Sequence, residues 1–179
     1  VFEAARQLGG RARRVDHAGV ALDNGLHILL GAYTDTLRLI QQVNPAHADA
    51  LWRLPLEWHV HNEFHLAAAR LPAPFHLLLG LLRARGLNFT EKFSAARFLL
   101  ALRNSRYTLA QDISVELLLR QYDQSERVRR VLWRPLCVAA LNTPPTLASA
   151  QVFVNVLRDS LDTAAAASDL VLARVDLSA

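Results

Sequence analysis

The segment Phe2-Glu3-Ala4-Ala5-Arg6-Gln7-Leu8-Gly9-Gly10-Arg11-Ala12 decides the fold class, because it joins a carboxylate, two adjacent glycines and an arginine. A carboxylate where a strand ends can accept hydrogen bonds from the two hydroxyls of a ribose. Adjacent glycines let the backbone approach a bulky anion, and an arginine offers paired donors to a phosphate. An ordinary strand and turn with a surface arginine explains the pattern equally well. The candidate nucleotide contacts are Glu3, Ala4, Gly9, Gly10, Arg11 and Ala12.

The composition indicates a packed globular chain. Of the 179 residues, 52% are apolar and only 20% are charged, the opposite of the balance found in disordered chains. The net charge of +4 comes mostly from arginines that are spread along the chain, so we expect no nucleic-acid partner. Cys137 is the only cysteine and lies among apolar residues, which predicts a buried, unreactive thiol. The longest apolar run, 77–82, is too short to span a membrane.

The first half of the chain alternates short strand patterns with one helix. Apolar residues separated by polar residues and glycines predict short strands with tight turns over 13–30. Helical spacing predicts a helix over 34–43, closed by Asn44-Pro45. Period-2 alternation then predicts a β-hairpin near 54–69.

The second half is predicted to be mainly helical. On the helix expected from Phe89 to Asn104, the stripe of Phe89, Phe93, Ala96 and Leu100 is attributed mostly to core packing. A helix capped by Ser125 should bend or end at Pro135. The remaining expected elements are helices over 74–85, 114–122 and 150–161 and a strand over 170–175. The predicted class is α+β, mainly α-helical.

A second segment carries a family resemblance together with the first. Leu22-Asp23-Asn24-Gly25-Leu26-His27-Ile28-Leu29-Leu30-Gly31-Ala32-Tyr33 resembles the strand and turn that pass the flavin ring in the FAD-dependent amine oxidase and phytoene desaturase superfamily. In that superfamily a strand ending in Glu precedes a double-glycine-Arg motif, as here. The resemblance implies FAD as cofactor, with Glu3 on the adenosine ribose, Gly9, Gly10 and Arg11 along the pyrophosphate, and Gly25 and His27 near the isoalloxazine.

Later runs resemble the squalene-associated branch of this superfamily. They are Leu132–Leu136, Ala140–Pro144, Ser160–Leu161 and Leu172–Ser178. The branch implies reductive removal of the hydroxyl from hydroxysqualene to form squalene, a step in hopanoid biosynthesis. Alternatives are a carotenoid or phytoene-type desaturase, an amine oxidase, or a non-catalytic helical lipid-binding module.

One feature of the superfamily is missing. Its Gly-x-Gly-x-x-Gly loop should lie about 20 to 30 residues before the acidic residue, where this chain has none. We therefore expect a fragment with an incomplete Rossmann core, inactive alone and binding FAD weakly or not at all. Its expected parts are a partial FAD-binding segment (1–33), a helical substrate-binding domain (34–165) and a return strand (166–179).

Asp23 and His27 are weak catalytic candidates, because histidine titrates in a useful range. The favoured interpretation is that Asp23 caps the turn and His27 packs on the cofactor. His59, His61 and His65 could hold a metal, but hairpin alternation explains them as polar-face residues, and we expect no metal.

The expected partner is a hydrophobic isoprenoid substrate. Apolar helices could line a tunnel for it. An exposed apolar patch with nearby arginines could also contact a membrane, so we expect a cytoplasmic protein that could sit peripherally at the inner membrane. A plain solvated face is the favoured interpretation of the arginines considered for lipid contact, which are Arg83, Arg85, Arg127, Arg129 and Arg130.

Overall fold

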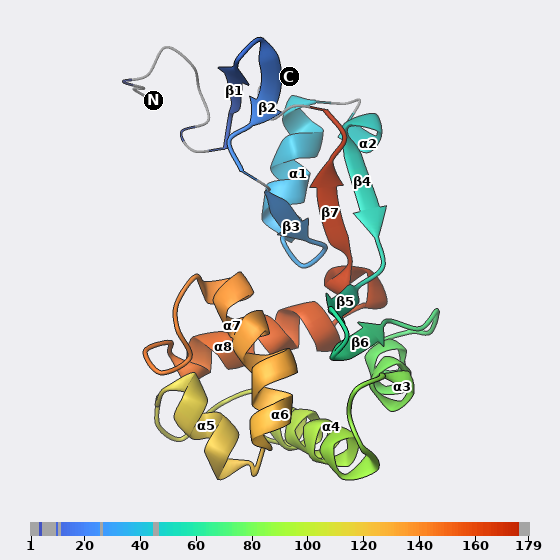
Figure 1. The fold of residues 1–179 in the computed structure, drawn as a ribbon, viewed down its shortest axis with the longest axis vertical. Coiled ribbons are helices and arrows are strands. Elements are labelled where there is room, and N and C mark those ends of the chain that lie inside the picture. The colour runs from blue at the N-terminus through green and yellow to red at the C-terminus, as the bar shows by residue number, and fades with distance from the viewer. Residues whose placement is uncertain (1–3, 5–9, 11, 26, 45–46, 176–179) are drawn as a thin grey trace. The chain divides into compact units, whose positions relative to one another are not determined.

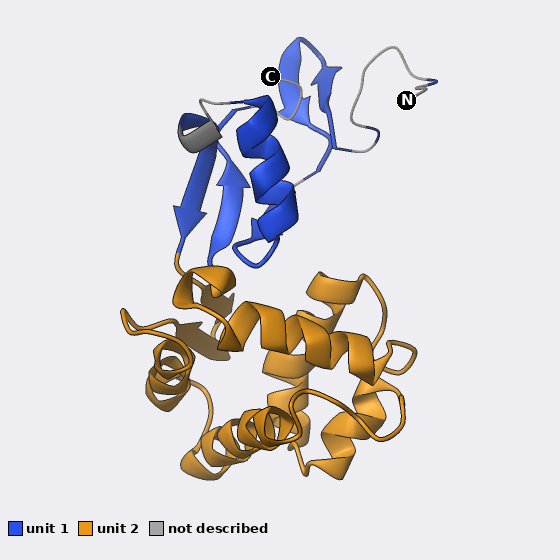
Figure 2. Ribbon diagram, turned by 180° about the vertical axis from the view of Figure 1, so that it is seen from behind, with its two compact units in different colours: residues 1–54, 169–179 blue, residues 55–168 orange. Residues whose placement is uncertain are grey.

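A computed structural model describes residues 4, 10, 12–25, 27–44 and 47–175 (Figure 1). The fold is α+β and mainly helical, as predicted. The chain forms two compact units, which we call unit 1 (residues 1–54 and 169–179) and unit 2 (residues 55–168) (Figure 2). The first segment of unit 1 extends to Leu54, because residues 34–54 include a strand that joins the sheet of this unit.

Unit 1 contains two small antiparallel sheets. Strands β1 (Arg14–His17) and β2 (Val20–Asp23) form a hairpin. The second sheet has the order β3-β7-β4, so β7 pairs with both neighbours and buries Val171. It therefore joins the two sequence segments of the unit. The other elements are β3 (Ile28–Leu30), α1 (Thr34–Val43), α2 (His47–Ala50), β4 (Leu51–Leu54) and β7 (Leu170–Ala173).

Unit 2 begins with the predicted hairpin, made of β5 (Glu57–Val60) and β6 (Phe64–Ala67). Phe64 and Leu66 are buried, so one face of the hairpin joins the core. A bridge between His65 and Arg85 holds the chain after the next helix against this hairpin. Gly86 allows the approach, since its φ is +90° and a Cβ there would lie 1.9 Å from the Glu63 carbonyl oxygen.

Local sequence signals explain where the helices of unit 2 begin. Asn88 and Glu91 form a capping box at the start of α4, with both hydrogen bonds 2.9 Å long. Ser114, Ser125 and Ser149 cap α5, α6 and α8. The α-helices are α3 (Phe75–Arg83), α4 (Phe89–Asn104), α5 (Val115–Gln121), α6 (Glu126–Val128), α7 (Arg134–Leu141) and α8 (Ala150–Leu157).

The prediction that Pro135 would bend or end the helix begun at Ser125 needs a correction. The chain continues through a π-helical turn, η1 (Arg129–Trp133), directly into α7. Pro135 falls in the first turn of α7, where a missing backbone N–H is tolerated. A second π-helical turn, η2 (Arg158–Asp162), extends α8, and a 3₁₀ turn, η3 (Ala165–Ser168), precedes β7.

The core of unit 2 uses a different face of α4 from the predicted one. Phe98 and Leu102 are buried, while Phe89, Phe93 and Leu100 are exposed. The ring of Phe98 lies 5.3 Å from that of buried Trp133, measured between centroids. Apolar residues cover more than one face of α4, so only contact with other elements selects the buried stripe.

Candidate functional site

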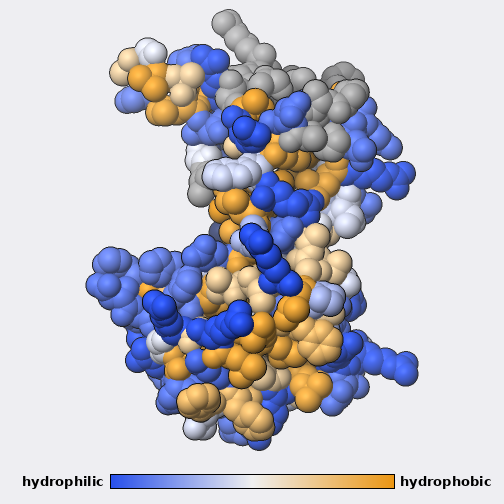
Figure 3. All heavy atoms as spheres, turned by 90° about the vertical axis from the view of Figure 1, so that its right-hand side faces the viewer, coloured by the Kyte–Doolittle hydropathy of each residue, from blue (hydrophilic) through white to orange (hydrophobic). Residues whose placement is uncertain are grey.

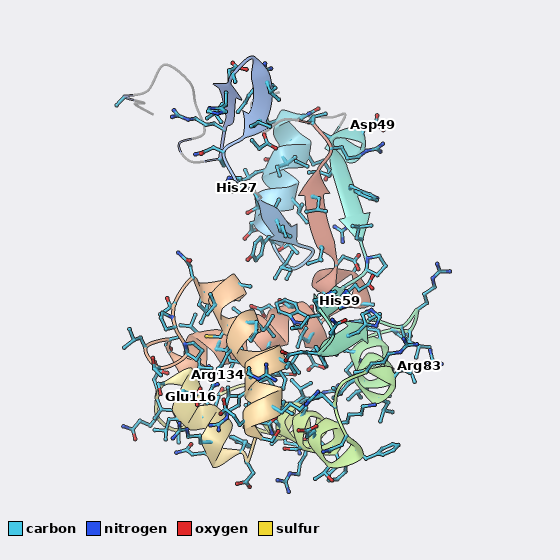
Figure 4. All side chains as sticks on the ribbon, viewed as in Figure 1. His27, Asp49, His59, Arg83, Glu116 and Arg134 are labelled. Atoms are coloured by element: carbon cyan, nitrogen blue, oxygen red, sulfur yellow. The ribbon has the colours of Figure 1, made fainter. Side chains whose placement is uncertain are left out.

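The candidate flavin-ring residues of unit 1 differ in exposure, since Gly25 is exposed and His27 is half-buried. The Gly25 N–H donates to the Asp23 carbonyl oxygen at 2.8 Å, and the His27 Nε2 lies 3.3 Å from the Asn24 carbonyl oxygen (Figure 4). Gly25 has a φ of +95°, and a Cβ there would meet nothing within 4 Å. A flat group could therefore approach the backbone at Gly25 without meeting a side chain.

The nucleotide motif is described only in part. Glu3, Gly9 and Arg11 lie outside the described residues. Ala4, Gly10 and Ala12 are exposed, and Gly10 has the positive φ of +57° that favours glycine.

The histidines of the hairpin form a polar face. His59 and His65 are paired across β5 and β6, with ring centroids 5.6 Å apart. His65 Nε2 lies 2.7 Å from Glu57 Oε1. Over the described part of the chain, no group of three or more His, Cys, Asp or Glu side chains is arranged to hold a metal. Cys137 is fully buried, and burial raises the pKa of its thiol.

Unit 2 contains an apolar hollow of about 70 Å³ that is partly open to solvent. The hairpin, helices α3, α4 and α7, and both π-helical turns supply its walls. Its lining contains no charged side chain, so it excludes polar groups. The lining residues are Leu56, Trp58, Leu66, Leu77, Leu81, Leu99, Leu132, Trp133, Leu136 and Leu161.

A second hollow of similar volume shares a wall with the first. Leu77, Leu99 and Leu161 line both hollows. The second hollow also contains a polar group of three residues: Arg103, Tyr107 and Asp162. Sequence reasoning did not identify this group, because its members come from α4, the loop after it and η2.

Arg103 and Asp162 form an ion pair, and the charge of Asp162 also acts on Tyr107. The Nε of Arg103 lies 3.4 Å from Oδ2 of Asp162. The Tyr107 side chain is buried, and this burial, followed by the negative charge of Asp162, raises its pKa to about 12. The phenol therefore remains protonated at neutral pH and can donate a hydrogen bond.

A strained turn positions Tyr107. Arg106 and Tyr107 have φ angles of +53° and +57°, a region that non-glycine residues seldom adopt. The Tyr107 N–H donates to the Leu102 carbonyl at 2.8 Å, and the Gln151 side chain donates to the Tyr107 carbonyl at 2.9 Å. Gln151 also accepts from the Leu109 N–H at 2.9 Å. Surrounding hydrogen bonds thus hold the backbone in an unfavourable conformation, which is a frequent property of functional sites.

Large apolar side chains are exposed on two neighbouring helices of unit 2. We call Phe75, Leu82, Phe89, Phe93 and Leu100 the α3–α4 face; the rings of Phe89 and Phe93 are 85% and 70% exposed. Figure 3 shows apolar residues, in orange, gathered among charged ones on this side of the unit.

Basic side chains lie on the same two helices as the α3–α4 face. Lys92 Nζ lies 5.8 Å from the centroid of the Phe89 ring and donates to the Leu82 carbonyl at 2.8 Å. Arg83 and Arg97 are exposed on the same two helices. In the described chain, no helix has the length and apolar character needed to cross a bilayer.

The sequence model of the family described as flavin-containing amine oxidoreductase matches residues 1–170 of the chain. A search of curated proteins returned no match. The family match includes the nucleotide motif, the segment from Asp23 to His27 and all of unit 2. The chain therefore belongs to the flavin-containing amine oxidoreductase family.

Proposed function

We propose that the protein is an FAD-dependent oxidoreductase acting on a C30 isoprenoid, most specifically one that removes the hydroxyl of hydroxysqualene to form squalene. Family membership supports flavin-dependent redox chemistry. The observation that carries the substrate class is the pair of adjoining apolar hollows in unit 2. Their leucine and tryptophan walls suit a hydrocarbon chain, whose transfer from water to an apolar wall is favourable.

The hollows also set a condition on binding. Each measures about 70 Å³, whereas pockets for drug-sized ligands hold roughly 300–1,000 Å³. A C30 chain therefore enters only if the shared wall of Leu77, Leu99 and Leu161 moves. Since Leu77 belongs to α3 and Leu99 to α4, these helices would have to move apart far enough both to join the hollows and to enlarge them.

FAD, when bound, supplies the electron pair for the reaction. In this chain, Glu3, Ala4, Gly9, Gly10, Arg11 and Ala12 would contact the nucleotide half, and Gly25 and His27 the ring. Unit 2 would bind the substrate chain, fix its orientation and exclude water.

We include a peripheral lipid contact in the proposal. The second hollow is lined by Leu78 and Leu100, and Leu100 is also part of the exposed α3–α4 face. This continuity gives an apolar molecule a route from a lipid surface to the hollow. The cations Arg83, Lys92 and Arg97 suit anionic head groups.

The test uses the full-length protein with FAD, a reductant and hydroxysqualene, with products identified by mass spectrometry. We expect squalene. Consumption of a primary amine, or desaturation of a carotenoid precursor in place of squalene formation, would assign one of the alternative activities. Retention of hydroxysqualene without any redox turnover would favour a lipid-binding module.

A further inference from the structure

We propose that Arg103, Tyr107 and Asp162 form a binding site for one hydroxyl group at the end of an otherwise apolar ligand, such as an isoprenoid or long-chain alcohol. The apolar character of the ligand rests on the proposed function. The hydroxyl specificity rests on the contacts of these three residues.

The residues that line the second hollow support a ligand with one polar group. Apart from these three residues, the hollow is lined only by Pro74, Leu77, Leu78, Ala96, Leu99, Leu100 and Leu161. A ligand with a single polar group would therefore find all its polar contacts in one place. Its hydrocarbon part would contact the leucines and the proline.

Asp162 offers an acceptor for a ligand hydroxyl. Asp162 Oδ2 faces Arg103, but Asp162 Oδ1 is buried and accepts no hydrogen bond in the structure. Buried polar atoms nearly always have a partner, and the desolvation cost of an unsatisfied acceptor is about 1–3 kcal/mol. A hydroxyl hydrogen from a ligand would satisfy Oδ1. The phenol of Tyr107 is protonated at neutral pH and is held towards Asp162, because burial, followed by the charge and the hydrogen bond of Asp162, raises its pKa. It therefore lies beside the same position and can turn its O–H to the oxygen of the ligand hydroxyl.

The charges of Arg103 and Asp162 favour a neutral ligand group over an ionised one. A ligand carboxylate would meet the negative charge of Asp162, and a ligand ammonium would meet the positive charge of Arg103. The Arg103–Asp162 ion pair balances the local charge. A neutral group that both donates and accepts therefore fits best, and a hydroxyl is the smallest such group.

The turn that carries Tyr107 is held in place before any ligand binds. Gln151, on α8, forms hydrogen bonds to the backbone of both Tyr107 and Leu109. This fixes the turn that carries Tyr107, although its backbone conformation is unfavourable. A recognition group held in place in this way loses little entropy when a ligand binds.

The test compares farnesol with its methyl ether, which lacks the donor, in the full-length protein. Binding is followed by tryptophan fluorescence, because Trp58 and Trp133 line the adjoining hollow. We expect the wild type to prefer the alcohol by about tenfold, which equals about 1.4 kcal/mol, the scale of one net hydrogen bond. Tyr107→Phe and Asp162→Ala should lower the preference below about threefold while retaining ether binding. Tyr122→Phe, whose ring packs on Phe98 outside the hollows, is the matched control and should retain the preference.

Three results would overturn the inference: equal affinity of the wild type for alcohol and ether, no binding of the alcohol, or tighter binding of farnesylamine than of farnesol. The ether affinity separates loss of recognition from loss of folding in the variants. A protein that prefers the alcohol but forms no squalene retains this site and refutes the proposed reaction. A protein that forms squalene without this preference does the opposite.

Discussion

Glu116 is a buried carboxylate whose role is structural. It accepts hydrogen bonds from Arg134 Nε and Nη2 at 2.9 Å and from Arg129 Nη1 at 3.0 Å (Figure 4). The hydrogen bond from Arg134 is the main cause that lowers the pKa of Glu116 to about 2. These contacts tie α5 to η1 and α7, and so stabilise the segment that passes through Pro135. A buried carboxylate is stabilised when its oxygens accept hydrogen bonds, and both oxygens of Glu116 do so.

Glu116→Gln should lower the free energy of unfolding at pH 7 by about 1–3 kcal/mol, because it removes the charged acceptor that Arg129 and Arg134 share and leaves Glu126 as their remaining charged partner. The wild-type pKa is depressed from 4.5, so this stabilisation is complete above pH 4.5 and disappears as the pH falls to about 2. Urea denaturation at several pH values measures it.

Asp123→Asn is the matched control for this change. Asp123 is 84% exposed and its contact with Arg97 is 3.8 Å long, so no measurable change is expected. A difference between wild type and Glu116→Gln that stays constant from pH 7 to pH 2.5 would contradict the argument.

At the scale of elements, α4 serves two purposes with two apolar faces. Ala95, Phe98 and Leu102 pack into the core, whereas Phe89, Phe93 and Leu100 are exposed. Burial of both faces would require a partner on each side, and in the described chain one side has none. The exposed stripe is therefore available for contact with lipid.

Phe98→Ala should destabilise the protein by about 3–5 kcal/mol, because it leaves a cavity beside Trp133 and Tyr122. Phe93→Ala, the same change on the same helix, should cost less than about 0.5 kcal/mol because its ring is mostly in water. Urea denaturation of the two variants provides the comparison. A larger loss for Phe93→Ala would show that the predicted stripe is the buried one after all.

At the scale of the whole molecule, family membership supports flavin-dependent redox chemistry, and the substrate class that we propose sets a further requirement. A redox enzyme for a water-insoluble substrate needs an apolar site and a route to it. The adjoining hollows and the α3–α4 face are candidates for these two parts.

The full-length protein should therefore bind vesicles that contain anionic lipid. Replacing Phe89 and Phe93 together by Asp should weaken binding at least about tenfold, because burying one phenyl ring contributes about 1.5–3 kcal/mol. Co-sedimentation measures this, and higher salt should weaken binding to the wild type. Leu147→Asp, at an equally exposed leucine between α7 and α8, should leave binding unchanged. Wild-type levels of binding by the double variant would exclude this face as the contact.

The sequence by itself determined the local elements and the family. The Thr34–Val43 helix, the hairpin and the serine caps follow from short-range patterns, which act within a few residues. The superfamily resemblance came from contiguous motifs, and the family match supports it.

Only the tertiary structure decided which residues meet. The pairing of β7 with β3 and β4, the buried side of α4, and the approach of Asp162 to Arg103 join residues far apart in the chain. Local patterns leave such choices open, because a helix with apolar residues on several faces can bury any of them. Competition among packing partners then selects one arrangement, and with it the polar group in the apolar hollow.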